Sequence, residues 1–426
     1  MSSSGKGGKP IGIGIIIGIV IGLVIGFGLG NPESSEDTTT STQTMKQNPQ
    51  LSGEVKIGLI LPLTGDLATH GEENWEGSKL GVVDFNKHLE KLGAGWNLKM
   101  VSEDSATSPV IALEKLTSLN AKGISIIVGL ETSSNIRNIK GYAESNNMLL
   151  VSCCSSAPAL AIKNDNLYRL VPDDSNQGTA LAKLIQHEGI EVIVPVWRAD
   201  TWGDGISDAT TGSFVERGGI TDEGIRYNPE SPEFSASTSL LAEKVRGYVD
   251  EYGADKVAVL FLGFVEILQF TQSASQHEVL DDVRWFGPGS NTKEYKLIDD
   301  PIGLEFSTSV QFTTVHVAAT KNPIYERVQA HIIEQLGRTP STFVHPSYDV
   351  VWIIGLSILE TQSTDVSKIK SVFSDVAGHY YGAIGPTILN EAGDLAQANY
   401  EVWGIRGGEW VLLGQYTSAT DSISLL

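Results

Sequence analysis

The feature that most constrains the fold is a repeated alternation of short apolar runs with amphipathic segments. Residues 55–61 form an apolar run, residues 72–89 carry apolar side chains at roughly helical spacing, and residues 98–101 form the next apolar run. Ser108 followed by Pro109 is typical of the N-cap and the first position of a further helix. This rhythm predicts an α/β fold built on doubly wound parallel sheets.

A second series of the same kind begins near residue 175, and a β-rich segment closes the chain at residues 385–412. The 426 residues, 41% of them hydrophobic, suffice for two cores. We therefore expect two lobes joined by a multi-strand hinge, with several chain crossings between them. The expected division is residues 54–173 plus 313–388 for lobe 1 and residues 174–312 plus 389–426 for lobe 2.

The N-terminal segment predicts a membrane anchor. Residues 11–29 are all apolar or glycine, and at about 1.5 Å per residue they would extend roughly 29 Å, enough to cross a bilayer. Lys6 and Lys9 precede this stretch and acids follow it, so the positive-inside rule leaves residues 1–10 in the cytoplasm. A cleaved signal peptide is the alternative, but the stretch is long for one and no Ala-x-Ala site follows it.

We accordingly expect one transmembrane helix at residues 11–29, a flexible Ser/Thr-rich linker at residues 30–53, and a single-pass protein of the cell membrane. Its C-terminal domain would lie outside the cytoplasm, on an archaeal cell surface. Glycines recur at every fourth residue of the span, which favours self-association of the helix, although a glycine-rich span without a partner is the plainer interpretation. These glycines are Gly14, Gly18, Gly22, Gly26 and Gly30.

Charge and missing motifs exclude several classes of function. The net charge of −21 lies entirely in residues 54–426, and a surface this acidic repels phosphate backbones, so we expect no nucleic-acid binding. The sequence has no Gly-x-Ser-x-Gly elbow, no His-Glu-x-x-His and no phosphate-binding loop. We therefore expect a protein that is not an enzyme and that carries neither a metal nor a cofactor.

Hydroxyl groups follow two of the expected strands. The apolar run 124–128 is followed by Gly-Leu-Glu-Thr-Ser-Ser at residues 129–134, and the run 148–151 by Ser-Cys-Cys-Ser-Ser at residues 152–156. Free backbone N–H groups and hydroxyls at the carboxyl ends of strands hold anions well, carboxylates in particular. Two neighbouring tips of this kind favour a small-ligand site over a catalytic one.

Cys153 and Cys154 are the only cysteines. Two adjacent cysteines make neither a disulfide framework nor a metal-ligand spacing. Because a bond between neighbours requires a strained ring, we expect small buried or site-lining thiols instead.

Several short motifs follow one another in a recognisable order between residues 54 and 415. They are Gly58–Gly65 (GLILPLTG), Glu103-Asp104 with Ser108-Pro109, Tyr168–Asp173 (YRLVPD), Trp202–Gly205 (WGDG), and the tail from Gly385-Pro386 to Trp403. In this order they resemble the solute-binding proteins of branched-chain amino-acid-type ABC importers, which have the type I periplasmic-binding-protein fold. The resemblance implies two hinged lobes that close on a small ligand, which is then delivered to ABC permease subunits in the membrane.

The resemblance also implies the site: the two strand tips hold a carboxylate and the second lobe supplies an aromatic wall. The expected ligand-binding residues are Ser133, Cys154 through its main chain, Ser155, Ser156, Trp202, His70, Glu131, Phe264, Glu266, Gly289 and Tyr348. The plainer interpretations are that Ser133 and Ser156 only cap the following helices, that Trp202 packs locally, and that His70 and Glu131 are surface residues.

One position departs from the family pattern. Amino-acid binders carry an acid after a strand of the second lobe, where it pairs with the ligand ammonium, whereas this chain has Gly289. The ligand is therefore an amino acid held by Glu266, or an amide, urea-like molecule or carboxylate that has no ammonium. The expected function is capture of such a small polar solute for an ABC importer. The alternative is an extracellular receptor that senses these compounds through a partner chain.

Overall fold

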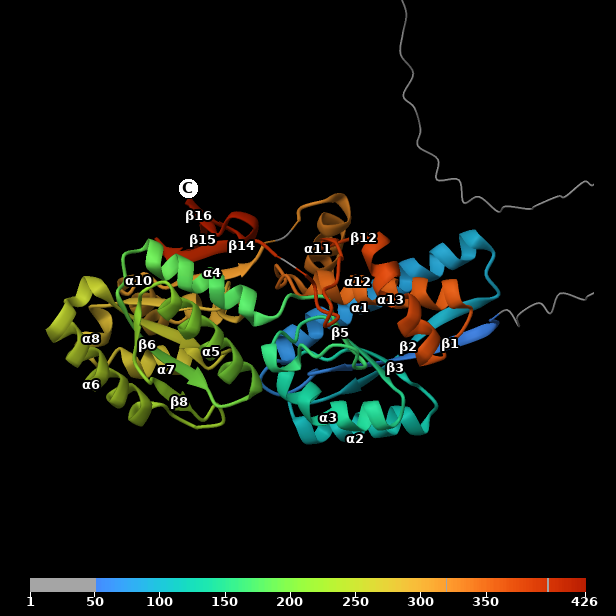
Figure 1. The fold of residues 1–426 in the computed structure, drawn as a ribbon, viewed down its shortest axis with the longest axis horizontal. Helices are drawn as coiled ribbons and strands as arrows, with labels where there is room; N and C mark the ends of the chain where they lie inside the picture. Colours follow the sequence, from blue (N-terminus) through green and yellow to red (C-terminus); the bar gives the residue numbers. More distant parts are fainter. Residues whose placement is uncertain (1–50, 319, 397) are drawn as a thin grey trace, which may run out of the picture. The chain divides into compact units, whose positions relative to one another are not determined.

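The structure, a computed structural model, describes residues 51–426 except 319 and 397. The first sheet has five parallel strands in the order β2-β1-β3-β4-β5 (Figure 1). Its strands are β1 (Gly53–Leu61), β2 (Trp96–Asp104), β3 (Ile126–Gly129), β4 (Leu149–Ser152) and β5 (Leu167–Arg169).

Helices cover both faces of this sheet, because its strands present apolar side chains on both sides. Buried side chains of β1, β3 and β4 pack on α1, α12 and α13 on one face and on α2 and α3 on the other. Ser108 accepts the Ile111 N–H and Pro109 is the first residue of α2, as predicted. The helices are α1 (Ala68–Leu92), α2 (Pro109–Ala121), α3 (Ser133–Ser145), α12 (Val344–Thr361) and α13 (Val366–His379).

The second sheet has nine strands. Six of them are parallel, and the β-rich end of the chain adds three antiparallel strands, β14, β15 and β16, beside β11. The strands are β6 (Val192–Arg198), β7 (Ile220–Thr221), β8 (Ile225–Tyr227), β9 (Val257–Leu262), β10 (Arg284–Gly287), β11 (Thr313–Val317), β14 (Tyr400–Arg406), β15 (Glu409–Thr417) and β16 (Ser422–Leu425).

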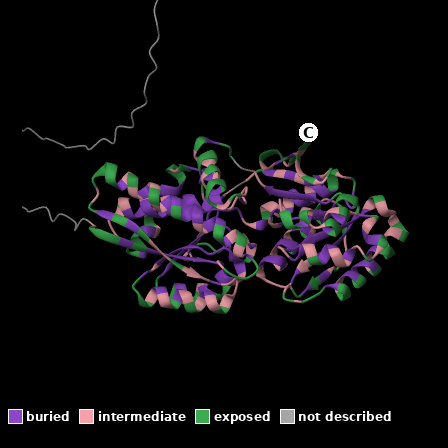
Figure 2. Cartoon of the chain, turned by 180° about the vertical axis from the view of Figure 1, so that it is seen from behind, coloured by how far each residue is buried: buried purple, intermediate pink, exposed green. Residues whose placement is uncertain are grey.

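This sheet is also covered on both faces. Alternate residues of β6 and β9 pack on α4 and α5 on one side and on α6 to α10 on the other. Figure 2 shows the buried residues of the chain in purple. The helices are α4 (Asp174–His187), α5 (Thr201–Glu216), α6 (Ser235–Tyr252), α7 (Ile267–Ala274), α8 (Glu278–Asp281), α9 (Tyr295–Asp299) and α10 (Pro301–Ser309).

The chain passes between the two sheets after β5, after β11 and before β14. Residues 313–317, with which the predicted segment 313–388 of lobe 1 begins, pair as β11 with β10 and β14 of the second sheet. The rest of that segment returns to the first sheet, where α11 (Pro323–Leu336) contacts α1 and α12, and the pair β12 (Tyr381–Gly382) and β13 (Gly385–Pro386) follows. The predicted α/β fold with parallel sheets is confirmed, and the chain crosses between the two sheets at three places.

The predicted membrane localisation has to be corrected. Within the part of the chain that the structure describes, no helix is both long enough and apolar enough to cross a bilayer. The expected span at residues 11–29 and its glycine stripe lie outside the described residues, as does the predicted linker at residues 30–53 up to residue 50; its last residue, Gly53, begins β1. The prediction of a single-pass membrane protein is therefore withdrawn, and with it the self-association through the span.

Candidate ligand-binding site

A cavity lies between the carboxyl ends of the strands of the two sheets, and both sheets contribute to its walls. Its volume is about 70 Å³, far below the roughly 300 Å³ at which ligand pockets for drug-sized molecules begin. Nine of the eleven predicted residues line it: His70, Glu131, Ser133, Cys154, Ser155, Ser156, Trp202, Phe264 and Gly289. We call this cavity the cleft.

The tips of β3 and β4 meet at the cleft as a network of hydroxyls. Ser133 Oγ and Ser155 Oγ lie 2.8 Å apart in a hydrogen bond, and the Ala157 N–H donates to Ser133 Oγ over 3.3 Å. Ser152 Oγ accepts the N–H groups of Cys154 and Ser155 at 3.2 and 3.0 Å. Thr132, not Ser133, is the N-cap of α3, so the Ser133 hydroxyl is not consumed by helix capping.

An ion pair behind these tips holds them in place. Arg169 is fully buried and binds Asp394 through Nε and Nη2, at 2.5 and 2.6 Å. Its Nη1 donates to the carbonyl oxygens of Ser155 and Ala157 at 3.3 and 2.8 Å. We call residues 152–157, which carry the hydroxyls at the tip of β4, the hydroxyl loop. Because the guanidinium of Arg169 is planar and its donors point in fixed directions, these bonds hold the backbone of the loop in one position.

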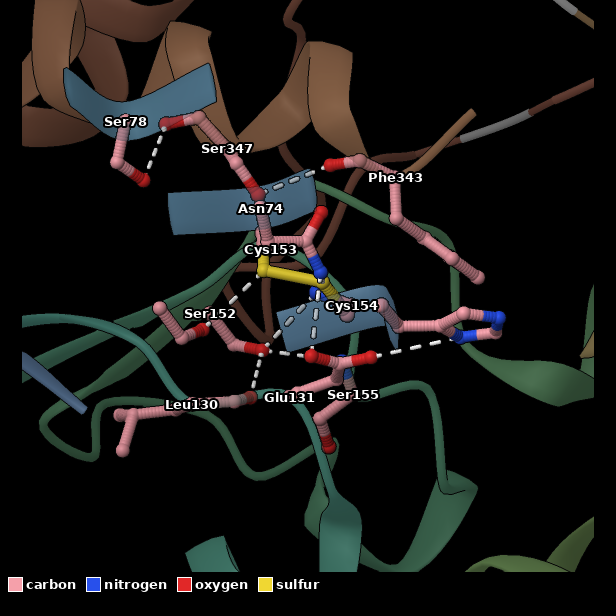
Figure 3. The surroundings of a disulfide bond; sticks show 12 residues. Asn74, Ser78, Leu130, Glu131, Ser152, Cys153, Cys154, Ser155, Phe343 and Ser347 are labelled. Carbon is pink, nitrogen blue, oxygen red and sulfur yellow. Dashed lines mark hydrogen bonds and ion pairs between the residues drawn. A yellow bond between two sulfur atoms is a disulfide. The ribbon is translucent and has the colours of Figure 1, made fainter. Parts of the chain in front are cut away.

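Cys153 and Cys154 form a disulfide at the tip of β4 (Figure 3). The prediction of two thiols is therefore corrected: the two neighbouring cysteines are bonded to each other where the chain bends after β4. Cys153 is fully buried, whereas Cys154 is 7% exposed and lines the cleft. The Asn74 side chain donates to Cys154 Sγ over 3.5 Å, so the disulfide is packed against α1.

An acid and a histidine face each other on the first-sheet side of the cleft. Glu131 Oε1 lies 3.6 Å from His70 Nδ1, and Glu131 Oε2 accepts a hydrogen bond from Asn74 Nδ2 at 3.2 Å. Burial lowers the pKa of His70, but the hydrogen bond and the charge of Glu131 outweigh burial and raise it above its ordinary value. His70 is thus protonated more readily than an ordinary histidine, and its protonated imidazole balances the negative charge of Glu131.

Two aromatic rings form the opposite wall. The ring centroids of Trp202 and Phe264 lie 4.5 Å apart, and the guanidinium of Arg198 lies 3.9 Å from the centroid of Phe264. Asp200 caps α5 through the N–H groups of Trp202 and Gly203, which fixes the indole at the first turn of that helix. The wall is therefore preformed.

Glu266 and Tyr348, the other two predicted residues, lie away from the cleft lining. Glu266 is buried and accepts hydrogen bonds from Arg198 Nη1 and from the Tyr227 hydroxyl, each at 2.9 Å. Tyr348 is buried in α12 and donates to Asp84 over 3.1 Å. Each side chain is hydrogen-bonded to residues of its own lobe, so neither is available to bind a ligand.

The space that an acid at position 289 would need is filled. A Cβ built on Gly289 would meet His316 Nδ1 at 2.7 Å and Gln177 Oε1 at 3.2 Å, and the Gly289 N–H donates to Gln177 Oε1 at 2.6 Å. His316 is 5% exposed, and its burial together with the charge of Lys293 lowers its pKa to about 3, so the imidazole is neutral. A side chain at position 289 would therefore clash with His316 and Gln177, whereas glycine fits.

Asp174 lines the cleft beside this cluster, and the sequence analysis missed it. It is 1% exposed at the start of α4, where it accepts hydrogen bonds from Ser156 Oγ at 2.8 Å and from Gln177 Nε2 at 2.7 Å. Burial raises its pKa to about 6 in spite of these bonds. The Asp173-Asp174 pair at the end of the Tyr168–Asp173 motif was the signal that could have found it.

No lysine or arginine is among the described residues that line the cleft, and no group of three or more His, Cys, Asp or Glu side chains among residues 51–426, apart from 319 and 397, is placed to hold a metal ion. The charged and titratable lining groups are Glu131, Asp174, His70, His316 and Tyr400, and burial raises the pKa of the Tyr400 hydroxyl. An anionic group in the cleft would therefore be held by neutral hydroxyl and N–H donors, and a cationic group would meet carboxylates.

The fold and the cleft together define a two-lobed ligand-binding protein of the type I periplasmic-binding-protein class. The chain belongs to the family described as "Receptor family ligand binding region", whose model matches residues 78–408. It is 25% identical over 400 residues to an uncharacterized protein of Methanocaldococcus jannaschii, and the alignment covers 89% of this chain and 94% of that protein. It is also 25% identical over 362 residues to the Leu/Ile/Val-binding protein homolog 3 of Brucella melitensis, covering 82% and 91%.

A crystal structure of the leucine-binding protein LivK from Thermotoga maritima has the same fold, with a TM-score of 0.73 and 21% identity over 86% of this chain and 99% of that one. The predicted resemblance to branched-chain amino-acid-type solute-binding proteins is thereby confirmed. The relatives with a named role are binding proteins, which also confirms the prediction that the chain is not an enzyme.

Proposed function

We propose that this protein is the solute-binding component of an ABC importer and that it captures a small zwitterion, an amino acid, in the cleft. The observation that carries the proposal is the division of chemistry inside the cleft. Hydroxyls and backbone N–H groups gather at the tips of β3 and β4, while an acid without a cationic partner in the cleft, Asp174, lies at the start of α4.

The hydroxyl network suits the carboxylate of such a ligand. Ser156 already donates its hydrogen to Asp174, and Ser133 and Ser155 share one hydrogen bond, so this pair leaves one hydroxyl hydrogen for the ligand. Such a donor holds a carboxylate without adding a formal charge. Trp202 and Phe264 would enclose the side chain from the second lobe. A ligand that contacts both lobes favours their closed arrangement, because only then are both sets of contacts made.

Asp174 suits the ammonium group of the ligand. Glu131 already has His70 as a neighbour, whereas Asp174 has only neutral partners in the cleft, Ser156 and Gln177. The charge of Arg169 lowers the pKa of Asp174, but burial outweighs it, and no cation contacts the carboxylate directly. A cationic ligand group beside it would therefore stabilise its charged form. This arrangement supports an amino acid over a simple carboxylate, because a simple carboxylate would only add its negative charge to those of Glu131 and Asp174. In this proposal Asp174, and not Glu266, pairs with the ligand ammonium.

We keep the two-lobe division in this proposal, with one change: β11 is placed in lobe 2 because it pairs only with strands of the second sheet. Lobe 1 then comprises residues 54–173 with α11 to β13. Lobe 2 comprises residues 174–317 with the C-terminal strands. The hinge runs through the segments between them.

A ligand screen by thermal unfolding tests the proposal. Amino acids, their 2-hydroxy-acid analogues and their amides are added to the purified chain in turn. A true ligand at a hundredfold excess over its Kd adds about 2.7 kcal/mol of stability. We expect stabilisation by amino acids and weaker or no stabilisation by the matched hydroxy acids; a response to hydroxy acids or amides alone would contradict the proposed ligand class.

A ligand-sensing receptor that acts through a partner chain is the second candidate, and the family description, a receptor ligand-binding region, favours keeping it. Ligand uptake separates the two functions. An importer component is expected to restore uptake of the bound solute when it is returned to cells from which it was deleted, together with its permease. A sensor would leave uptake unchanged.

A further inference from the structure

Two acids line the cleft, and the proposed function gives a role to only one of them, Asp174. The other, Glu131, follows the tip of β3 and lines the same cavity. Its side chain contacts Asn74 and His70, and Asp174 is hydrogen-bonded to neither of these residues. The two carboxylates therefore occupy separate places in the lining, and Glu131 is available for a different group of the ligand.

The backbone just before Glu131 is held in an unfavourable conformation. Leu130 has a φ of +55°, in the left-handed region that a leucine rarely adopts. Its N–H donates to the Ile60 carbonyl at 2.8 Å, and its own carbonyl accepts the Ser152 hydroxyl at 2.7 Å (Figure 3). Backbone strain that is fixed from both sides in this way is found mostly at functional sites. Here it fixes the point from which the Glu131 side chain enters the cleft.

One oxygen of Glu131 is held by the protein and the other is open to the cleft. Oε2 accepts the Asn74 side chain, which also donates to Cys154 Sγ, so the carboxylate has a fixed position. Oε1 has only the long 3.6 Å contact with His70 Nδ1, beyond the length of a normal hydrogen bond. The fully enclosed polar atoms that lack a partner include none from Glu131, so Oε1 keeps a surface that faces the cavity.

An open carboxylate oxygen accepts hydrogen bonds and does not donate them. An aliphatic side chain placed against Oε1 would remove its water and return no hydrogen bond, which costs free energy. A long cationic side chain does not suit a cavity of about 70 Å³, and His70 already balances the charge of Glu131. The group that fits is a short, neutral side chain with a hydrogen to donate, and a hydroxyl is the smallest such group.

We infer, on the basis of the proposed function, that Glu131 selects the side chain of the ligand by accepting a hydrogen bond from its hydroxyl group, so that the preferred ligands are amino acids of the serine and threonine type. Each polar group of the ligand then has its own partner: the hydroxyl loop for the carboxylate, Asp174 for the ammonium and Glu131 Oε1 for the hydroxyl. The aromatic wall of Trp202 and Phe264 covers the apolar remainder, such as the threonine methyl group.

Threonine and valine form a matched pair of probes, because they have nearly the same shape and differ by a hydroxyl in place of a methyl group. Calorimetric titration of the full chain is expected to show threonine binding about tenfold more tightly than valine or better, the ratio for one hydrogen bond to a charged acceptor. Valine binding as tightly as threonine, or more tightly, would overturn the inference.

Glu131→Met keeps an unbranched side chain of similar length and removes both acceptor oxygens. It should lower the affinity for threonine to that for valine, while valine binds as before or more tightly. If Glu131 instead paired with the ammonium or only supported the fold, both affinities would fall by the same factor and the threonine preference would survive, which would contradict the inference. Thermal unfolding verifies that the variant is folded, and Glu131→Leu gives the same readout if Glu131→Met does not fold.

Glu144→Met is the control, since it makes the same substitution at an exposed acid of α3 in the same lobe, where Glu144 pairs only with Lys140. Both affinities and their ratio should be those of the unaltered chain. A loss of the threonine preference in this variant as well would show that the preference depends on overall charge and not on a contact with Glu131.

The ligand screen separates a failure of this inference from a failure of the proposed function. If other amino acids bind and neither threonine nor serine does, the role of Glu131 is wrong and the capture of amino acids still stands. If no amino acid binds, the proposed function is wrong and the selection by Glu131 falls with it.

Discussion

Ser156 Oγ donates a hydrogen bond to Asp174 Oδ2 over 2.8 Å, and this bond joins the hydroxyl loop of the first sheet to the first helix of the second lobe. The same carboxylate accepts from Gln177, which in turn accepts the N–H of Gly289 at the tip of the second sheet. A single buried acid thus connects both halves of the cleft. Its charge is the feature from which the ligand class was inferred.

Replacing Asp174 by Asn should stabilise the ligand-free protein at high pH. Because burial raises the pKa of Asp174 from 3.8 to about 6, the folded state disfavours the charged carboxylate, and stability present below pH 3.8 is lost as the pH rises through 6. Asp174→Asn removes this loss, which is on the order of 2–3 kcal/mol at pH 8. Chemical unfolding of both forms at pH 8 and at pH 3.5 measures it.

Asp173→Asn is the matched control for that experiment. Asp173 is the neighbouring residue and caps α4 by accepting the Ser175 N–H, a role that Asn fills equally well. The charge of Asp173 contributes a little to the raised pKa of Asp174, so Asp173→Asn should gain much less stability at pH 8 than Asp174→Asn does, and none at pH 3.5. A gain at pH 8 in this variant as large as in Asp174→Asn would remove Asp174 as the cause.

Ser133→Ala should weaken ligand binding by about tenfold, since one hydroxyl hydrogen bond is worth roughly 1–1.5 kcal/mol. The residue lines the cleft and pairs with Ser155, but it does not cap α3, so the fold should persist with an unchanged circular dichroism spectrum. Ser145→Ala, at the exposed end of the same helix, is the control and should bind normally. Identical ligand affinity in both variants would remove Ser133 from the site.

Trp202→Ala should also weaken binding without unfolding the protein, because it removes the aromatic wall of the second lobe. The indole is 7% exposed and packs on Phe264, so some loss of stability is expected as well, of about 3 kcal/mol or more for a buried aromatic ring. Calorimetric titration at a temperature where the variant remains folded separates the two effects. Unaltered affinity there would show that the indole does not contact the ligand.

Reducing the Cys153–Cys154 bond should lower ligand affinity, because Cys154 lines the cleft and its N–H is held by Ser152 Oγ in the disulfide-bonded loop. Thiol titration of the unfolded chain should detect no free thiol before treatment with a dithiol and two afterwards, in keeping with the two cysteines of the sequence. The Cys153→Ser, Cys154→Ser double variant should resemble the reduced protein and be insensitive to the dithiol. Two free thiols in the untreated protein would contradict the disulfide.

Breaking the Arg169–Asp394 pair should destabilise the protein strongly. Both side chains are almost completely buried, and Arg169 also binds two carbonyl oxygens of the hydroxyl loop. Arg169→Ala leaves a buried carboxylate unpaired, for which about 3–5 kcal/mol is expected. Lys163→Ala, which removes the exposed Lys163–Glu391 ion pair, is the control and should change the unfolding free energy by no more than about 1 kcal/mol.

Much of the architecture could be predicted, because the βαβ rhythm and the helix caps are local signals. The strand tips could be predicted too, since the carboxyl ends of parallel strands meet at one edge, and this brought Ser133 and Cys154 together. The exception was β11. This short strand lies next to a place where the chain passes between the two sheets, and its sequence does not show which sheet it joins.

The remaining site residues depend on partners that are distant in the sequence. Glu266 is removed from the cleft by Arg198 and Tyr227, which lie 68 and 39 residues away. Gly289 is explained only by Gln177 and His316, which come from other elements of the fold. Composition and spacing carry no record of such contacts.

Two calorimetric titrations show whether Asp174 selects an amino acid over a simple carboxylate. The best amino acid from the screen and its 2-hydroxy-acid analogue are each titrated into the unaltered chain and into Asp174→Asn. We expect the unaltered chain to bind the amino acid at least tenfold more tightly, and Asp174→Asn to lose this preference while it keeps its affinity for the hydroxy acid. Equal binding of both molecules by the unaltered chain, or a preference that survives in Asp174→Asn, would contradict it.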